Sequence, residues 1–249
     1  MHNSFWPEGK SAAISITFDD ARPSQIDVAV PILDRHGVFG TFYVSPAGVE
    51  ERLAGWRAAV ARGHEIANHT FSHPCSGNFP WSRGNALEDY TPARIEADMT
   101  RADKFIEDTL GVTARTFAYP CGQKFVGRGA KRQSYAPLVA RRFLVGRGAF
   151  DETPNDPEFC DLACVTGISI DGVTRERLLE YVRKTADQAA WLVVFCHEVG
   201  ASSELSLATE LFDWLCRTVK ADKELWADTV AAIGTYITEK RGAGAPGAL

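Results

Sequence analysis

Short apolar runs rich in β-branched residues alternate with amphipathic helical patterns seven or eight times along the chain of 249 residues. The first run, 12–18, alternates in polarity in the manner of a β-strand. The run 191–196 (WLVVFC) is apolar throughout, as expected for a strand buried on both faces. Strands that alternate with helices predict a parallel α/β fold, either a barrel or an open doubly wound sheet.

The residues that follow the expected strands favour the barrel. Polar or reactive side chains stand at the carboxyl ends of several strands, namely Asp19, Asp20, His69, Tyr119, Cys121 and His197. In a barrel these ends meet at one rim, whereas an open sheet spreads them along a crevice. No glycine-rich phosphate loop follows any strand. The sequence therefore predicts an α/β barrel of seven or eight strand–helix units.

The boundaries of the elements follow from periodicity and from glycine and proline stops. Strands are expected at 12–18, 38–44, 64–68, 113–119, 143–146, 165–170, 191–196 and 225–227. Helices are expected at 25–36, 49–62, 91–111, 174–188, 204–219 and 229–240, with a short one after 134. Long loops are expected at 74–91, 122–134 and 151–161, and a loop as long as 74–91 usually forms a wall or lid over a site.

No repeat or linker divides the chain, so residues 1–249 are expected to form one domain with its core at about 10–240 and a flexible tail at 242–249. The net charge of −5 and the absence of a basic run argue against nucleic acid or an anionic membrane as partner. No apolar stretch approaches the roughly 20 residues that span a bilayer. The N-terminus shows no signal peptide, so the chain as it stands is expected to be cytoplasmic, or exported with its signal removed.

Six cysteines are too few for a disulfide scaffold in a domain of this size. Cys160 and Cys164 have a spacing that zinc could use, but no second pair follows, so they are expected to be structural. A disulfide between Cys75 and Cys121 is conceivable, although sequence does not establish connectivity. Burial as small hydrophobic residues is the default for the rest.

His69 and His73 place two imidazoles four residues apart, and Pro74 argues that they follow a strand rather than lie on a helix. Together with Asp20 they form a two-histidine, one-carboxylate set that suits zinc, cobalt or iron. A bound metal lowers the pKa of its water from about 15.7 to around 7, so the adjacent Asp19 could complete the deprotonation. His197 could protonate a leaving group from the opposite side. Taken singly, a histidine in a turn and an Asp-Asp pair in solvent remain open readings.

Three stretches resemble motifs of one family: Thr17-Phe18-Asp19-Asp20, His69-Thr70-x-x-His73 and Phe195-Cys196-His197. They are similar in order and spacing to the first, second and fifth motifs of the polysaccharide deacetylases, the NodB-homology carbohydrate esterases of family 4. The resemblance covers roughly residues 10–240. It implies a distorted (β/α)7–8 barrel and a hydrolase that releases acetate from an N- or O-acetylated oligo- or polysaccharide.

The same resemblance implies a role for each matching residue. Asp19 matches the catalytic base and His197 the catalytic acid. The ligands of a divalent ion, expected to be zinc with cobalt, nickel or manganese as alternatives, are Asp20, His69 and His73. The stretch 117–122 matches the third motif, which assigns oxyanion or substrate binding to Tyr119, Pro120 and Cys121, with the backbone N–H of Cys121 as the oxyanion donor.

Two positions depart from the family pattern, which has an arginine where this chain has Ala118 and an aromatic residue where it has Cys121. Because that arginine helps to hold the base, Arg147 at the end of the next strand is a candidate substitute. No stretch clearly matches the fourth motif, whose carboxylate supports the catalytic histidine. Asp171 is the nearest candidate, but its expected role is a surface turn.

Other readings of the site are a metal-dependent amidase acting on a small cyclic or linear amide, a decayed carbohydrate-binding protein, and a non-haem iron oxygenase. Asp19 and the α/β alternation argue against the oxygenase. Trp81, Tyr90 and Tyr119 could stack on a sugar face or serve loop packing. The remaining histidines are expected to be structural or at the surface, namely His2, His36 and His64.

Overall fold

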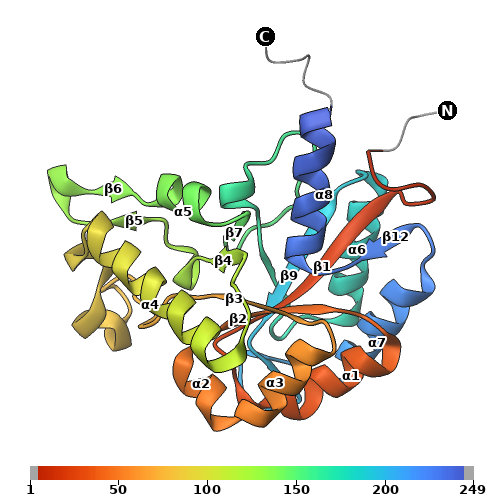
Figure 1. Cartoon of the computed structure of the whole chain (residues 1–249). Coiled ribbons are helices and arrows are strands. Elements are labelled where there is room, and N and C mark those ends of the chain that lie inside the picture. The colour runs from red at the N-terminus through yellow and green to blue at the C-terminus, as the bar shows by residue number, and fades with distance from the viewer. Residues whose placement is uncertain (1–4, 244–249) are drawn as a thin grey trace.

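The computed structural model describes residues 5–243 and contains a curled parallel sheet with helices packed around it (Figure 1). The strands of this sheet are β1 (Ala12–Asp19), β2 (Gly40–Val44), β3 (Glu65–Asn68), β4 (Thr116–Ala118), β7 (Val145–Arg147), β8 (Ile168–Ser169), β9 (Trp191–Cys196) and β12 (Leu225–Ala227). Their order is β7-β4-β3-β2-β1-β9-β8, with β12 beside the first half of β1, and all pairs are parallel.

The two ends of the sheet approach each other, which makes the curled sheet a distorted barrel. Val165, just before β8, donates its N–H to the Gly146 carbonyl at 2.9 Å, and the Gly148 N–H donates to the Val165 carbonyl at 2.8 Å. These bonds form a short parallel bridge between Arg147 and Val165. The predicted barrel class is thereby confirmed. The seam, where β7 meets the segment before β8, is closed by this one bridge, whereas a regular barrel has a full pair of strands there.

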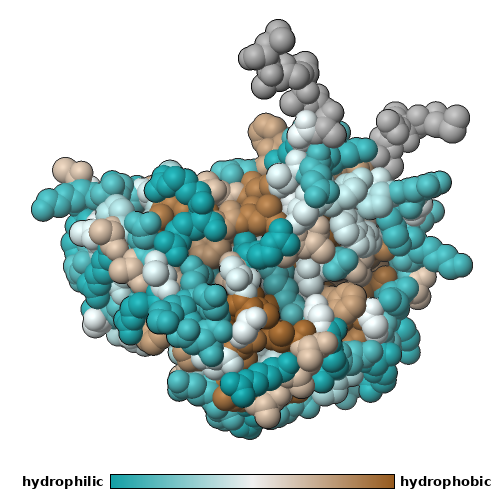
Figure 2. Space-filling view, in the orientation of Figure 1, coloured by the Kyte–Doolittle hydropathy of each residue, from teal (hydrophilic) through white to brown (hydrophobic). Residues whose placement is uncertain are grey.

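Helices cover the outside of the sheet. They are α1 (Val30–His36) with a preceding π-helical turn η1 (Gln25–Ala29), α2 (Pro46–Glu51), α3 (Leu53–Ala61), α4 (Pro92–Leu110), α5 (Ala136–Arg142), α6 (Arg175–Asp187), α7 (Thr209–Ala221) and α8 (Val230–Ala243). Figure 2 shows a mostly hydrophilic face, with hydrophobic side chains gathered toward its middle. No helix in the described range 5–243 is both long and apolar enough to cross a bilayer.

Aromatic packing holds the helices on the sheet. Phe18 of β1 stacks on Phe42 of β2 with ring centroids 4.7 Å apart, and Phe212 of α7 meets Phe18 edge-on at 5.7 Å. Trp56 of α3 packs against Phe42 from the same layer. All four side chains are fully buried, so truncating any of them to alanine is expected to cost about 3–5 kcal/mol.

Local signals set several helix ends as predicted. Gly37 ends α1 in the left-handed conformation with φ 62°, which an L side chain adopts only with strain. Thr91 caps α4 by accepting a hydrogen bond from the Arg94 N–H, and Pro92 occupies the first helical turn.

Other boundaries were wrong because short elements carry too little periodicity. The expected loop 122–134 contains the antiparallel pair β5 (Phe125–Val126) and β6 (Gln133–Ser134). The expected helix 204–219 begins only at Thr209, because β11 (Ser206–Leu207) pairs with β10 (Glu198–Val199). The expected helix 49–62 is two helices, α2 and α3. The tail predicted from 242 is helical at its first two residues, since α8 continues to Ala243. Residues 244–249 and His2 lie outside the described residues.

Candidate active site and metal centre

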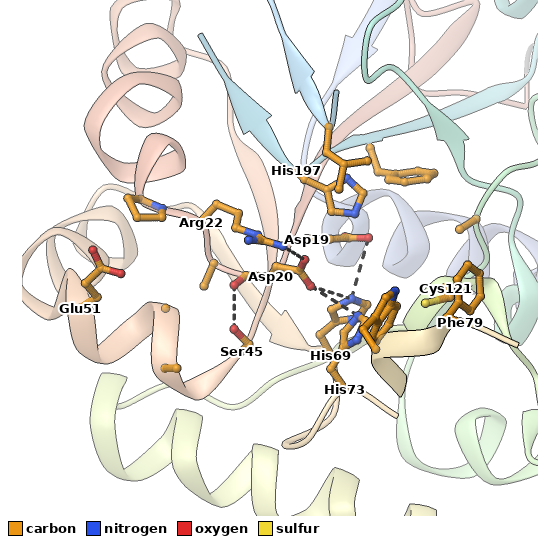
Figure 3. A pocket seen from close by; sticks show the side chains of 18 of the residues that line it. Asp19, Asp20, Arg22, Ser45, Glu51, His69, His73, Phe79, Cys121 and His197 are labelled. Atoms are coloured by element: carbon orange, nitrogen blue, oxygen red, sulfur yellow. Dashed lines mark hydrogen bonds and ion pairs between the residues drawn. The ribbon is translucent and has the colours of Figure 1, made fainter. Parts of the chain in front are cut away.

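The carboxyl ends of β1, β3, β7 and β9 surround one cavity of about 760 Å³. Figure 3 shows Asp19, Asp20, His69, His73 and His197 facing this cavity. The sequence placed these five side chains on one rim, and the structure brings them together there. Hydrophobic side chains form the rest of the wall, including Phe79, Trp81, Phe150, Phe195 and Leu205.

Asp20, His69 and His73 form the candidate metal centre. The Asp20 Oδ1 atom lies 3.7 Å from His69 Nε2 and 3.5 Å from His73 Nε2. One ligand atom from each residue lies within 4.8 Å of the others, and this is the cluster of potential metal ligands found in the described part of the chain. A divalent ion between them would receive two imidazole nitrogens and one carboxylate oxygen, a donor set typical of zinc, cobalt and iron sites.

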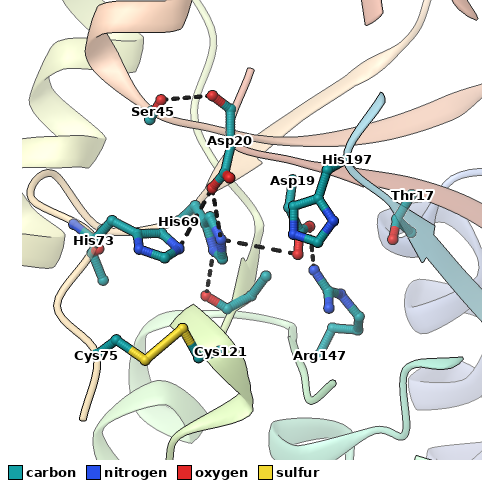
Figure 4. Close-up of polar contacts among 12 residues, drawn as sticks. Thr17, Asp19, Asp20, Ser45, His69, His73, Cys75, Cys121, Arg147 and His197 are labelled. Atoms are coloured by element: carbon teal, nitrogen blue, oxygen red, sulfur yellow. Dashed lines mark hydrogen bonds and ion pairs between the residues drawn. A yellow bond between two sulfur atoms is a disulfide. The ribbon is translucent and has the colours of Figure 1, made fainter. Parts of the chain in front are cut away.

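The surroundings of His69 prepare it to bind a metal. Its Nδ1 atom lies 2.9 Å from the Ala118 carbonyl, so Nδ1 carries the proton and the Nε2 lone pair faces Asp20 (Figure 4). Burial lowers the pKa of His69 to about 4, against the opposing effect of the nearby Asp19. The imidazole is therefore neutral at pH 7, which is the form that coordinates metals, and the residues present fit a divalent ion.

The backbone around the site is strained. Seven non-glycine residues in the described chain have positive φ, and six of them belong to the site and its loops: Asp20, Ala21, Thr70, His73, Cys121 and Phe150. Such conformations cost of order 1–3 kcal/mol each and persist only where the surroundings enforce them. Their concentration here indicates a site built for function.

A buried carboxylate from α4 enforces the loop that carries His73. Asp98 accepts hydrogen bonds from the backbone N–H groups of Phe71 and Ser72, both at 3.0 Å. The Thr70 hydroxyl accepts the His73 N–H at 3.0 Å. Sequence reasoning missed Asp98, because nothing in the pattern of an amphipathic helix separates a carboxylate that supports a distant loop from one in solvent.

Asp19 is paired with Arg147. The guanidinium Nη2 bonds Asp19 Oδ1, and Arg147 is completely buried. Burial alone would raise the pKa of Asp19, but Arg147, His69 and His197 together hold it below its usual value. The second carboxylate oxygen, Oδ2, lies 3.9 Å from His69 Nε2. Asp19 is therefore an ionised carboxylate with one oxygen fixed and the other facing the metal centre.

His197 and Asp171 form a dyad on the other side of the cavity. His197 Nδ1 lies 2.7 Å from Asp171 Oδ2, and the His197 backbone N–H donates to Asp171 Oδ1 at 3.0 Å. Burial lowers the pKa of His197, but its hydrogen bond to the Asp171 carboxylate and the charge of Asp19 outweigh this effect, so the pKa is raised. Asp171 lies in a turn as expected, but its side chain is only 7% exposed and bonds His197, so the expected role at the surface was wrong.

The third-motif stretch contributes less to the cavity than expected. Cys121 lines it, with φ 51°. Tyr119 does not: its ring packs between Phe117 and Tyr135 in the core, and its hydroxyl donates to the Ala163 carbonyl at 2.7 Å. Pro120 is buried as well and does not line the cavity. Both were expected to contact substrate because they lie in the stretch that resembles the third motif. The match of a motif does not reveal that a side chain after a strand turns back into the core.

Cys75 and Cys121 are joined by a disulfide with their Cα atoms 6.2 Å apart (Figure 4). Because Cys75 follows the His73 loop and Cys121 lies in the turn after β4, this bond ties the loop of the candidate metal ligand His73 to the candidate oxyanion turn. The free cysteines Cys160 and Cys164 are not part of a metal cluster in the described residues. Cys160 Sγ lies 3.3 Å from Arg241 Nη2, and Cys164 Sγ lies 3.8 Å from the Tyr119 hydroxyl. Their structural role stays a prediction.

Of the aromatic residues expected near the substrate, Trp81 lines the cavity and is 62% exposed. Tyr90, at the end of the 74–91 loop, is buried and does not line the cavity. Sequence reasoning missed the neighbouring Phe79 and Phe150, which expose 41% and 66% of their surface. A contiguous exposed apolar wall of this kind marks a binding site. Away from the site, His36 pairs with Asp213 and His64 with Asp34, as expected for structural histidines.

The fold and the site define an α/β barrel with a two-histidine, one-carboxylate cluster at its rim, and comparison with known proteins gives its family. A family model described as polysaccharide deacetylase matches residues 7–133, slightly more than half of the chain. The chain belongs to the polysaccharide deacetylase family. Arg147, Asp171 and His197 lie beyond the matched residues, so their place in the site rests on the structure.

Two curated relatives are similar over part of their length. Chitin deacetylase 1 of Cryptococcus neoformans is 31% identical over 171 residues, which is 68% of this chain and 34% of the relative. A chitooligosaccharide deacetylase of Sinorhizobium fredii is 40% identical over 63 residues, 25% of this chain and 29% of the relative. The chain spans about a third or less of the length of the first curated relatives that it matches.

Solved structures share the fold at lower identity. A putative polysaccharide deacetylase from Mycobacterium smegmatis has a TM-score of 0.65 at 17% identity, covering 98% of this chain and 95% of the other. A family 4 acetyl xylan esterase from Clostridium thermocellum, solved with a cobalt ion, has a TM-score of 0.58 at 21% identity, covering 92% and 96%.

Proposed function

We propose that the protein is a metal-dependent hydrolase that removes acetyl groups from an N- or O-acetylated carbohydrate. The observation that carries this proposal is the placement of Asp19. One of its oxygens is fixed by the buried Arg147, and the other faces the cluster of Asp20, His69 and His73. A carboxylate held in this way serves as a base beside a metal centre.

Asp20, His69 and His73 would hold the divalent ion, with zinc as the first candidate. When bound, the ion supplies Lewis-acid polarisation of the acyl carbonyl and makes a water more acidic. Asp19 Oδ2 accepts the proton of the attacking water, and Arg147 keeps this carboxylate ionised until it does so.

His197 acts on the leaving group. Its Nδ1 atom is occupied by Asp171, which leaves Nε2 to deliver a proton to the departing amine or alcohol. The raised pKa of His197 keeps the imidazolium available near neutral pH. The Cys121 backbone N–H is the candidate donor to the developing oxyanion.

The cavity suits a sugar unit in size and in chemistry. Its volume of about 760 Å³ lies within the usual range for ligand sites. Phe79, Trp81 and Phe150 offer apolar faces on which a pyranose ring can stack. The printed names of the relatives, chitin deacetylase and chitooligosaccharide deacetylase, make N-acetylglucosamine oligomers the first substrates to test.

The test is acetate release by zinc- or cobalt-loaded protein from N-acetylated and O-acetylated glycans side by side, with chelated protein as the control. Release that chelator abolishes supports the proposal, and the responding substrate class fixes the bond type. Failure to release acetate from any glycan at any metal loading contradicts the proposal. Metal-dependent opening of small cyclic amides in the same assays would then favour the amidase reading.

A further inference from the structure

Gln25 has no role in the chemistry described above, yet it contacts both halves of it. Gln25 begins the turn η1 and is completely buried. Its side-chain Nε2 donates one hydrogen bond to the Asp19 carbonyl at 2.6 Å and another to the His197 carbonyl at 2.8 Å. A single carboxamide thus joins the backbone of the candidate base to the backbone of the candidate acid.

The position of this link explains what it can do. Strands β1 and β9 are neighbours, and their last register pair is Phe18 with Cys196. Asp19 is the last residue of β1 and His197 is the first residue after β9, so both lie just beyond the last pair of this ladder. By bonding the carbonyls of both Asp19 and His197, the Gln25 side chain continues the link between the two strands one residue beyond their last register pair. It thereby sets the separation of the two strand ends.

The carboxamide of Gln25 is well suited to bond two backbone carbonyls at once. A primary carboxamide has two N–H donors, and both are used here. The Gln25 Oε1 atom is buried without a hydrogen-bond partner in the described structure. A buried acceptor without a partner is unfavourable, so a purely packing role would be filled better by an apolar side chain of the same length. π-Helical turns such as η1 are frequent at functional sites.

We propose that Gln25 is a positioning residue for the deacetylation reaction, which clamps the strand ends carrying Asp19 and His197 at the separation needed for one water and one acyl group between them. This inference rests on the proposed function. Gln25 neither lines the cavity nor belongs to the candidate metal cluster, so its loss affects the alignment of base and acid more than the binding of substrate or metal.

The test compares Gln25→Met with a matched control, Asn155→Leu. Both substitutions keep the approximate size of the side chain and remove the donors. Asn155 is also buried, and its Nδ2 donates to the carbonyls of Thr166 and Trp191, both at 3.2 Å. Trp191 begins β9, so this clamp holds the end of the same strand remote from His197.

Gln25→Met is expected to lower kcat for acetate release by about 10–100-fold, since a displacement of about 1 Å costs on that order, with KM and zinc affinity within about threefold of wild type. Asn155→Leu is expected to keep kcat within about threefold. Equal losses of kcat in both variants, or wild-type kcat in folded Gln25→Met, overturn the inference. If Gln25→Met does not fold, Gln25→Asn replaces it: its shorter amide reaches one carbonyl at most, and wild-type kcat in that variant overturns the inference equally.

Amide hydrogen exchange provides a readout that does not depend on activity. In Gln25→Met the peptides covering 15–25 and 192–200 are expected to exchange faster, whereas in Asn155→Leu they are expected to match wild type. Unchanged exchange in both peptides overturns the clamp. If the wild-type protein releases no acetate but Gln25→Met exchanges faster in both peptides, the proposed function fails while the structural role of Gln25 as a clamp stands.

Discussion

Ala118 and Arg147 are register partners in the parallel pair of β4 and β7. The polysaccharide deacetylase motif has an arginine at the position of Ala118, and here the guanidinium comes from the residue directly across the ladder. Ala118 packs with Tyr43 and Ala67, and the Arg147 guanidinium carbon lies 4.9 Å from the centre of the Tyr43 ring. The space left by alanine on one strand is thus compatible with the arginine on the next.

Replacing Arg147 with methionine is expected to remove most activity and to destabilise the protein by about 3–5 kcal/mol, because it leaves the Asp19 carboxylate buried without a counterion. Urea unfolding and acetate release measure the two effects. The double variant Asp19→Asn/Arg147→Met removes both charges and is expected to be more stable than Arg147→Met alone.

Moving the arginine back tests whether the two positions are equivalent. The double variant Ala118→Arg/Arg147→Ala is expected to recover at least about tenfold in kcat/KM over Arg147→Ala. No recovery, in a variant that unfolds cooperatively, would mean that position 147 supplies a geometry that position 118 does not.

Asp19 and Asp20 are adjacent in sequence, but substitutions at the two positions are expected to have different effects, on turnover for Asp19 and on zinc binding for Asp20. Asp19→Asn is expected to lower kcat by about 10²–10⁴-fold, the usual contribution of general acid–base catalysis, while zinc affinity stays within about tenfold. Asp20→Asn is expected to weaken zinc binding, because it removes the charged oxygen near both imidazoles. Calorimetric titration with zinc distinguishes them, and loss of zinc binding in Asp19→Asn would show that the two roles are reversed.

Asp171→Asn is expected to shift the pH dependence of the reaction. The pKa of His197 is lowered by burial but raised overall, mainly by its hydrogen bond to Asp171. Removing that charge lowers the pKa, so the alkaline limb of kcat/KM moves to lower pH. The His197–Asp171 pair also makes the stability of the fold depend on pH. Because the pKa of His197 is raised on folding, this stabilisation is present below the unfolded pKa of about 6.5 and is lost as pH rises through the higher folded pKa. An alkaline limb that does not move excludes His197 as the acid.

Opening the Cys75–Cys121 disulfide is expected to lower the free energy of unfolding by about 2–4 kcal/mol, since the bond closes a long loop with a sequence separation of 46. Cys75→Ala/Cys121→Ala provides the measurement by urea unfolding. Reductant should bring wild type toward this variant and leave the variant itself unchanged. A response of the double variant to reductant would point to the other cysteines.

The sequence was sufficient for the barrel and for the five side chains on its rim because both depend on strand ends, which periodicity locates well. It was insufficient where function depends on the direction of a side chain. Tyr119 follows a strand as His69 does, yet its ring turns into the core. Asp98 and Gln25 act through backbone groups 26–27 and up to 172 residues away in sequence, and no local pattern identifies such partners.

The seam of the barrel has a consequence for how this protein responds to heat. Two backbone hydrogen bonds join Val165 to the strand of Arg147, which makes the seam weaker than the ladders that β1 forms with β2 and β9. Local opening there draws Arg147 away from Asp19 while the rest of the fold persists. We therefore expect the Asp19–Arg147 pair to be lost on heating below the temperature of global unfolding, so that any activity that depends on this pair ends before the fold does.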